Sequence, residues 1–253
     1  MVRALTRHVP SSFANALSAV PPDSPIDVAL ARQQHLMYCM ALAECGATVT
    51  TLPVDERCPD SVFVEDTAVV VDKQALITRP GAPTRQLETA AVAVVLDAWL
   101  NCIPMTEPAT LDGGDCMLVG RTMYVGRSAR TNAAGIAQLA RAFAPRGIDV
   151  VPIDLPAGVL HLKCVCSPLG GGRILLADDS IDRAVFRGLE LVAVPAQESY
   201  AANAVAIDKR VIIAAGFPRT HEALAKAGFK PYPVPCSEVR KADGSLTCQS
   251  IVF

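Results

Sequence analysis

Three carboxylates interrupt an apolar stretch early in the chain, in the segment 60–66. Asp60 precedes the apolar residues 62–64 and Glu65 and Asp66 follow them, leading directly into the run 67–71, which is rich in β-branched residues. Burying acids beside such a run costs free energy unless a cation pairs with them. The segment is therefore either a strand end with solvated acids or a site for a cationic ligand.

A second acidic segment contains two glycines. In Asp112-Gly113-Gly114-Asp115, the glycines between two acids allow an unusual backbone path and a close approach to another element. A structural turn and a functional turn both explain this pattern.

His161 and Cys248 complete the set of chemically reactive candidates. His161 lies in the apolar segment 159–163, where a lone histidine is more often a hydrogen-bonded core residue, and Cys248 is one of nine cysteines. Together, a cysteine, a histidine and a carboxylate supply a thiolate nucleophile, a general acid/base and a group that orients the imidazole. Metal binding uses the same residue types, but no pair here has zinc-finger or metalloprotease spacing, so we expect no metal.

The composition restricts the class of protein that carries these residues. Of the 253 residues, 51% are hydrophobic and 19% charged, which excludes a disordered chain. The net charge of −2 provides no electrostatic basis for binding nucleic acid or an anionic membrane. No apolar run approaches the roughly 18–20 residues that span a bilayer, and we see no secretion signal. Nine cysteines without a Cys-x-x-Cys pair indicate reduced thiols and a cytoplasmic location.

One long helix is predicted over 26–45. Its predicted end is Gly46, and the apolar residues at helical spacing predict its buried face. That predicted stripe consists of Leu30, Leu36, Met37 and Met40.

Pairs of short apolar runs around tight polar turns recur along the chain and predict hairpins. The predicted pairs are 69–71 with 75–77, 117–119 with 123–125, 162–166 with 174–176, and 205–207 with 211–213. Helical stretches follow three of them, at 87–96, 133–143 and 221–227. A repeat of about 40–50 residues favours a ring or array of ββα units within one α/β domain, 1–253. No glycine-rich phosphate loop is present, so no nucleotide cofactor is expected.

Several motifs, in this order, resemble those of the dimethylarginine dimethylaminohydrolases, members of the guanidino-group modifying superfamily. The resemblance runs through 52–57, 60–66, 77–81, 111–115, 128–132, 160–163, 200–203, 237–238 and 243–248. It implies a five-bladed α/β propeller with the active site in the central channel, closed by the terminal segments 3–8 and 249–253. It also implies catalysis without a metal, nucleotide or redox cofactor.

The resemblance implies a role for each candidate residue. Cys248 matches the nucleophile, His161 the general acid/base and Asp112 the carboxylate that holds the histidine, a position where some bacterial members have Glu. Asp66, with Glu65 beside it, matches the acids that bind the guanidinium.

The remaining transfers concern the amino-acid end of the substrate and the lid. Arg85 and Arg130 match the pair that binds the α-carboxylate, and Asp60 matches the contact to the α-amino group. Leu17 aligns with a lid-loop leucine, in a segment, 11–25, that matches the family poorly. Ala242 lies at a backbone-carbonyl contact.

Lys163 favours a methylated substrate over free arginine. Related arginine deiminases usually have Asp two residues after the histidine, and a methylated nitrogen lacks the N–H groups that such a carboxylate would accept. The implied reaction is hydrolysis of Nω-methylated arginine to citrulline. The alternatives left open are a hydrolase or deiminase of free arginine or of another Nω-substituted arginine, and a non-catalytic propeller. The partner is a small molecule, and a homodimer is an open alternative to a monomer.

Overall fold

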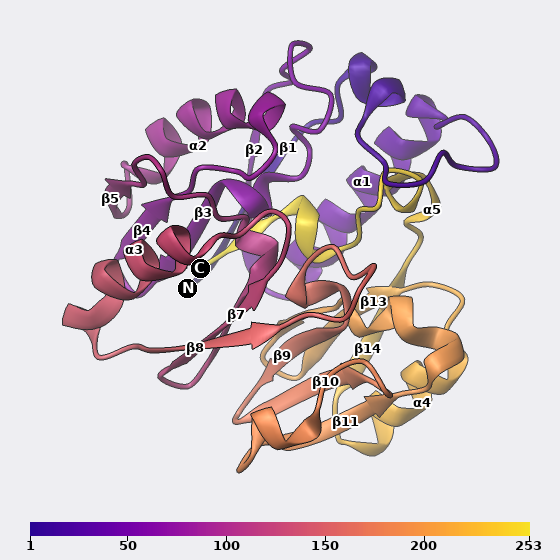
Figure 1. The fold of residues 1–253 in the computed structure, drawn as a ribbon. Helices are drawn as coiled ribbons and strands as arrows, with labels where there is room; N and C mark the ends of the chain where they lie inside the picture. The colour runs from indigo at the N-terminus through magenta and orange to yellow at the C-terminus, as the bar shows by residue number, and fades with distance from the viewer.

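A computed structural model describes residues 1–253, whose strands form five three-stranded sheets arranged around a central channel (Figure 1). The sheet orders are β15-β1-β2, β3-β4-β5, β6-β7-β8, β9-β10-β11 and β12-β13-β14. In each sheet the first strand is antiparallel to the second, and the second is parallel to the third. The predicted five-bladed propeller is confirmed, with a third strand added to each ββα unit.

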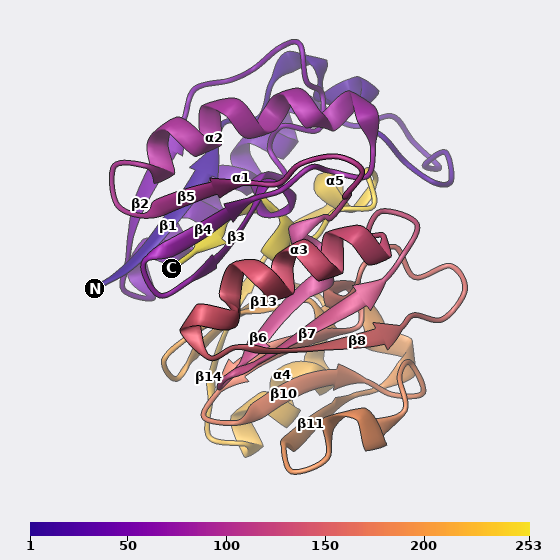
Figure 2. The same ribbon diagram turned by 60° about the vertical axis from the view of Figure 1, so that its left-hand side comes forward.

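The strands and helices follow one another in a repeating order. The strands are β1 (Val2–Arg7), β2 (Ala47–Leu52), β3 (Ala68–Val71), β4 (Gln74–Ile77), β5 (Asn101–Pro104), β6 (Cys116–Val119), β7 (Thr122–Arg127), β8 (Asp149–Asp154), β9 (Cys166–Gly170), β10 (Arg173–Ala177), β11 (Glu190–Val194), β12 (Val205–Ile207), β13 (Arg210–Ala214), β14 (Lys230–Val234) and β15 (Ile251–Val252). The helices are α1 (Val28–Glu44), α2 (Thr89–Leu96), α3 (Ala133–Phe143), α4 (Pro218–Lys226) and α5 (Ser237–Arg240). Helices α1 to α4 each connect the second and third strands of a sheet, and lie toward the outside of the ring (Figures 1 and 2). In the β9-β10-β11 sheet a short 3-10 helix, Arg183–Phe186, replaces this helix.

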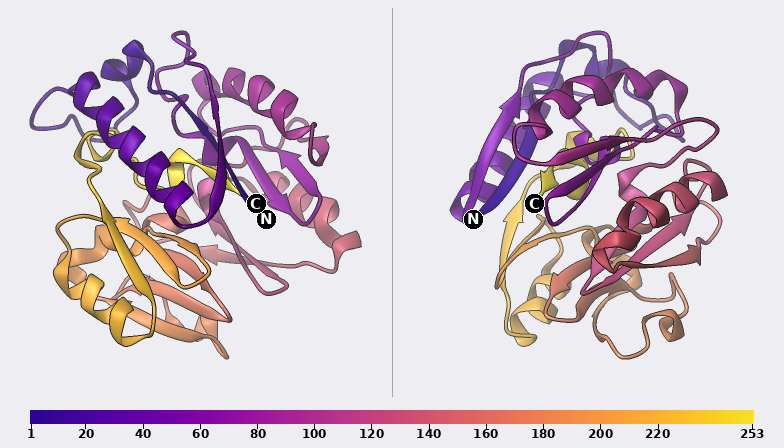
Figure 3. Two further views of the ribbon diagram at one scale, coloured as in Figure 1. Left: turned by 180° about the vertical axis from the view of Figure 1, so that it is seen from behind. Right: turned by 90° about the vertical axis from the view of Figure 1, so that its left-hand side faces the viewer.

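The two ends of the chain meet in one sheet. β1 pairs with β15, and the N–H of Arg3 donates to the carbonyl of Phe253. The termini lie side by side in every view (Figure 3). This confirms the predicted closure of the ring.

The predicted hairpins are confirmed with one correction. Each has a two-residue turn whose first residue has a positive φ, at Asp72, Gly120, Gly171 and Asp208, as Asp and Gly tolerate best. The strand predicted from 162 begins only at Cys166, because residues 162–164 form a 3-10 turn.

The predicted buried face of α1 is wrong. Leu36, Met37 and Met40 are 60%, 43% and 54% exposed, and Leu30 also faces solvent. The opposite face is buried through polar partners: Nδ1 of His35 lies 2.9 Å from Gln249 Oε1, and the Tyr38 hydroxyl lies 2.7 Å from Ser250 Oγ. The α1 helix therefore packs His35 and Tyr38 against the C-terminal segment and buries Leu42 in the core, while the four residues of the predicted stripe lie outside.

The apolar core is divided among the interfaces between neighbouring sheets. One cluster joins Leu5 of β1 to Ala75 and Ile77 of β4, and another joins Met117 of β6 to Ile174 of β10. Three further clusters occupy the remaining interfaces. Because each sheet is buried against both neighbours, the ring forms a rigid frame around the channel.

Candidate active site

Five short 3-10 turns surround the channel, and each one precedes the first strand of a sheet. They span Val64–Thr67, Gly113–Asp115, Leu162–Cys164, Ala196–Ala202 and Thr247–Gln249. All four segments singled out by the chemistry of their residues lie on or beside these turns: Glu65 and Asp66, Asp112 to Asp115, His161, and Cys248. The fold thus brings together residues that are up to 183 positions apart in sequence, from Glu65 to Cys248.

A cavity of about 180 Å³ lies at this end of the channel and collects most of the candidate residues. We call it the polar cavity. Its lining includes Leu17, Asp60, Asp66, Arg85, Arg130, His161, Ala242 and Cys248. Of the candidates from sequence, only Glu65 and Asp112 are absent from the lining.

Asp112 binds the imidazole of His161 from outside the polar cavity. Nε2 of His161 lies 2.9 Å from Asp112 Oδ2, and both side chains are buried. Asp112 Oδ1 also accepts the N–H of Gly81 at 2.8 Å. The pKa of His161 is raised to about 9: burial opposes the charged form, but Asp66, Asp112 and Asp115 more than compensate. The imidazole is therefore a cation at neutral pH.

The two glycines between Asp112 and Asp115 permit this packing. A Cβ on Gly114 would lie 2.8 Å from His161 Nδ1 and 2.9 Å from Asp66 Oδ1, and a Cβ on Gly113 would collide with the carbonyl oxygen of Glu65. The expected close approach to another element is confirmed, and it is what allows the imidazole to lie against this loop.

Cys248 faces the same cavity without a hydrogen bond to His161. Burial raises the pKa of its thiol well above 9, and the charges of Glu65 and Asp66 raise it further. In this environment the thiol is therefore neutral. A cation placed beside Asp66 would offset the two carboxylates and favour the thiolate.

Asp66 and Arg85 form a buried ion pair in the cavity wall. Arg85 Nη1 lies 2.5 Å from Asp66 Oδ2, and the rest of the guanidinium binds Glu88 and the carbonyl of Phe63. Asp66 Oδ1 accepts the N–H of Gly114 at 2.9 Å. The pKa of Asp66 is lowered to about 2, because His161, Arg85 and these hydrogen bonds outweigh the effect of burial. Asp66 is thus an anion that presents charge to the cavity.

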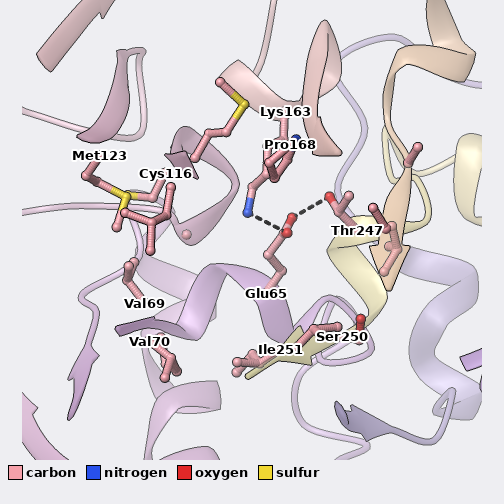
Figure 4. Close-up of a pocket in the computed structure, with 18 residues that line it drawn as sticks. Glu65, Val69, Val70, Cys116, Met123, Lys163, Pro168, Thr247, Ser250 and Ile251 are labelled. Carbon is pink, nitrogen blue, oxygen red and sulfur yellow. Dashed lines mark hydrogen bonds and ion pairs between the residues drawn. The ribbon is translucent and has the colours of Figure 1, made fainter. Parts of the chain in front are cut away.

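Glu65 lies on the far side of its turn. Its Oε1 accepts a hydrogen bond from Lys163 Nζ at 2.5 Å, and its Oε2 one from Thr247 Oγ1 at 2.7 Å (Figure 4). The structure therefore does not bring the Glu65 carboxylate into the polar cavity with Asp66. Instead Glu65 and Lys163 line a second cavity of about 290 Å³, which we call the apolar cavity.

The segment around Leu17 covers the polar cavity and is attached to it by carboxylates. The N–H of Leu17 donates to Asp60 Oδ1 at 3.0 Å, and the N–H of Ala19 donates to Asp243 Oδ2 at 2.5 Å. Burial raises the pKa of Asp60, while Arg85 opposes that shift. Leu17 itself is 40% exposed, so it lies at the rim.

Arg130 and Ala242 complete the candidate set. Nη1 of Arg130 lies 3.8 Å from Asp112 Oδ2, and the side chain is partly accessible, unlike Arg85. Ala242 is buried and lines the cavity beside Asp243 and Gly244.

The charges around His161 do not favour a metal ion. Atoms of Asp66, Asp112 and His161 lie within 4.8 Å of one another, close enough to ligate one cation. The oxygens of both carboxylates already accept hydrogen bonds, and the protonated imidazole of His161 has no free lone pair to offer a metal ion. We assign no metal to this cluster.

Some lining residues were not selected from the sequence. Phe63 and Asp243 lie within motifs of the resemblance, but their chemistry alone suggested no role. Glu88, which binds Arg85, lies in a helical segment with no motif. Burial raises its pKa to about 7, against the effect of Arg85. Only the fold shows that these side chains meet.

Comparison with known proteins agrees with this geometry. Residues 19–215 match the family model described as eukaryotic N,N-dimethylarginine dimethylhydrolase. The chain is 39% identical over 229 residues to the N(G),N(G)-dimethylarginine dimethylaminohydrolase of Pseudomonas aeruginosa, covering 90% of each chain. It is 40% identical over 253 residues to the enzyme of the same name from Streptomyces coelicolor, covering 98% of this chain and 96% of that one.

A solved structure of the Pseudomonas aeruginosa protein, a cysteine-to-serine variant complexed with citrulline, superposes with a TM-score of 0.95. It is 36% identical, and the match covers 99% of this chain and 98% of that one. With its five sheets, its nucleophile candidate and its histidine in one cavity, the chain belongs to the dimethylarginine dimethylaminohydrolase family.

Proposed function

We propose that this protein hydrolyses Nω-methylated L-arginines, asymmetric dimethylarginine and monomethylarginine, to L-citrulline and dimethylamine or methylamine. The observation that carries the proposal is the polar cavity, which joins Cys248, His161 and Asp66 in one small space. Relatives named for this activity, from Pseudomonas aeruginosa and Streptomyces coelicolor, share 39% and 40% of their residues with this chain. The whole chain, 1–253, acts as a single catalytic domain, since the cavity takes residues from Leu17 to Cys248.

The substrate guanidinium binds against Asp66. Both are buried and oppositely charged, so the ion pair is strong and its geometry is fixed by hydrogen bonds. Bringing this cation next to the thiol offsets the two carboxylates that raise the pKa of Cys248. Substrate binding therefore favours the thiolate of Cys248 when the guanidinium that it attacks is in the cavity.

The α-amino acid end of the substrate lies toward the rim of the cavity. Arg130, with Arg85 behind it, binds the α-carboxylate, and Asp60 with the carbonyl of Ala242 binds the α-amino group. Leu17 covers the bound molecule. Because Arg85 already holds Asp66 and Glu88, the more accessible Arg130 makes the larger contribution to binding the carboxylate.

The reaction proceeds in two halves with His161 acting in both. The Cys248 thiolate attacks the central guanidinium carbon, and the bond from that carbon to the methylated nitrogen breaks as the His161 imidazolium protonates the departing amine. The neutral imidazole then takes a proton from water as the hydroxide attacks the S-alkylthiouronium carbon. The C–S bond then breaks, the added oxygen loses its remaining proton to solvent, and citrulline and the thiolate are released. Asp112 keeps the imidazole oriented throughout.

Two further properties are part of the proposal. The exposed apolar stripe of α1, with Leu36, Met37 and Met40, supports association of two copies of the chain into a homodimer. The nine cysteines are all free, which supports a cytoplasmic location with reducing conditions. Separately, none of the helices combines the length and apolarity that crossing a membrane requires.

The test is citrulline release from asymmetric dimethylarginine, monomethylarginine and arginine, measured in parallel. We expect turnover of the methylated substrates by the wild type and none by Cys248→Ala. Turnover of arginine alone would contradict the proposal and identify a deiminase. Folded protein that turns over none of the three would also contradict it.

A further inference from the structure

The 3-10 turns around the channel are joined to one another by a closed series of hydrogen bonds. Asp66 connects the turn 64–67 to Gly114 in the next turn, and Thr247 connects the turn 247–249 back to Glu65. Asp115 joins the turns 113–115 and 162–164, and Asn203, which follows the turn 196–202, binds both the turn 162–164 and the turn 247–249. Both side chains are buried, and neither lines the polar cavity or the apolar cavity.

Asp115 connects three parts of the catalytic machinery. Its Oδ1 accepts the N–H of Leu162, the residue after His161, at 3.0 Å. Its Oδ2 accepts the hydroxyls of Ser128 and Thr131, each at 2.6 Å. These residues flank Arg130.

The two hydroxyls are in turn bound to the backbone of the site. Ser128 Oγ accepts the N–H of Arg130 at 3.0 Å, and Thr131 Oγ1 accepts the N–H of Asp112 at 3.2 Å. A single carboxylate thereby fixes the backbone at His161, Arg130 and Asp112. A carboxylate that accepts three directed hydrogen bonds leaves little freedom to the segments that donate them.

Asn203 makes the corresponding connection for the nucleophile. Its Oδ1 accepts the N–H of Thr247, the residue before Cys248, at 2.9 Å. Its Nδ2 donates to the carbonyl of Lys163 at 2.8 Å and to Thr247 Oγ1 at 3.0 Å. The amide uses both its acceptor and its donors, so it ties the turn of Cys248 to the turn that follows His161.

We propose that Asp115 and Asn203 are positioning residues for the reaction, which set the mutual placement of His161, Arg130 and Cys248 across three sheets without touching the substrate. The inference rests on the proposed function for its kinetic part. Displacing a reacting group by about 1 Å can cost on the order of 10²-fold in rate, so such residues affect catalysis although they lie outside the cavity.

The two residues have different expected signatures. Asn203→Ala releases the nucleophile turn and the carbonyl of Lys163 but leaves Arg130 held, so kcat falls by about 10²-fold while KM stays within about threefold of wild type. Asp115→Asn keeps an acceptor for Leu162 but offers an N–H group where Ser128 and Thr131 need an acceptor. Since this affects both His161 and Arg130, kcat falls and KM rises together.

The matched control is Glu198→Gln. Glu198 is also a buried carboxylate, and it accepts the N–H groups of Arg219 and Thr220 and the Thr220 hydroxyl. It lies in the turn 196–202 and caps α4, and none of its hydrogen bonds reaches the turns that hold Asp66, Asp115, His161 or Cys248. We expect this variant to lose stability with kcat and KM unchanged. A fall in kcat that merely follows the loss of folded protein in all three variants would overturn the proposal.

A measurement without substrate separates this proposal from the proposed function. Iodoacetamide alkylation of Cys248, read by mass spectrometry, is expected to be about fivefold or more faster in Asn203→Ala, because the loosened turn exposes the thiol. His161 is expected to titrate at lower pH in Asp115→Asn by NMR, since the facing carboxylates are then Asp66 and Asp112 only. Alkylation and titration as in wild type would overturn the inference, whether or not methylarginine is a substrate.

Discussion

The two cavities are built on the same frame of five sheets but differ in their chemical character. The apolar cavity is lined mainly by side chains of the first strands of all five sheets, including Val69, Cys116, Pro168, Ala206 and Ile251 (Figure 4). The polar cavity is lined by turns and loops outside those strands. Strand positions must fit their neighbours, so they remain apolar, whereas turn positions are free to carry charge. The ion pair of Glu65 and Lys163, with Thr247, lies next to the apolar cavity, one residue from Asp66 and from Cys248.

The sharpest contrast compares one cysteine from each cavity. Cys248→Ala removes the proposed nucleophile, so citrulline formation should fall at least ~10⁴-fold. Cys116→Ala removes a thiol of the apolar cavity, whose pKa burial raises beyond any functional range. This control should keep kcat within about twofold and lose only about 1–2 kcal/mol of stability. Equal loss of activity in both would show that the two cavities do not differ in function.

The ion pair of Glu65 and Lys163 should behave as a buried ion pair when the stability of its variants is measured. Glu65→Gln leaves Lys163 without its carboxylate, and Lys163→Met leaves Glu65 without its ammonium group, so each should cost about 3–5 kcal/mol of the free energy of unfolding. The double variant should recover most of that loss, because no unpaired charge remains. Urea unfolding of all four proteins measures the coupling. Additive losses would mean that the pair contributes nothing as a pair.

A substitution of Asp112 tests how the imidazole of His161, the proposed general acid/base, is oriented. Asp112→Asn preserves shape but favours the wrong imidazole tautomer and removes a charge that supports the imidazolium, so kcat should fall by about 10²–10⁴-fold. KM should change less, since Asp112 does not line the cavity. Steady-state kinetics with asymmetric dimethylarginine checks this. Activity within a few-fold of wild type would contradict the assignment of Asp112.

The charge of His161 should appear in the pH dependence of stability. Its pKa in the folded protein, about 9, lies above the ordinary value of 6.5. The stabilisation from its proton is therefore fully present below pH 6.5 and disappears as the pH rises through 9, a loss of about 3 kcal/mol. His161→Gln should lack this loss. The test is the midpoint of urea unfolding, measured for both proteins between pH 6 and 9.5. Parallel curves of midpoint against pH would contradict the raised pKa of His161.

The smallest expected effect concerns the pKa of the Cys248 thiol, measured without substrate. Asp66 raises the pKa of Cys248. Asp66→Asn should therefore lower that pKa, which thiolate absorbance near 240 nm measures, with Cys248→Ser as the blank. A pKa that is unchanged or raised in Asp66→Asn would show that its carboxylate does not act on the thiol.

The sequence alone was sufficient for the repeated pattern and for the reactive residues. Hairpin turns with Asp or Gly at the bend, and β-branched runs on either side, are local signals, so the repeats were visible without coordinates. Closure by the terminal segments and the roles of Cys248, His161 and Asp112 came from resemblance to a family. The spacing of these residues in the chain carries no information on their distance in space.

Only the tertiary structure decided which side of an element is buried and which cavity a side chain faces. In α1 both the Leu36 face and the His35 face have helical spacing, and the choice depended on partners near the C-terminus, Gln249 and Ser250. Neighbours in sequence likewise separate in space: Asp66 faces the polar cavity while Glu65 faces Lys163. A 3-10 turn rotates successive side chains by about 120°, so adjacent residues point to different cavities, and which one each meets depends on the neighbouring sheets.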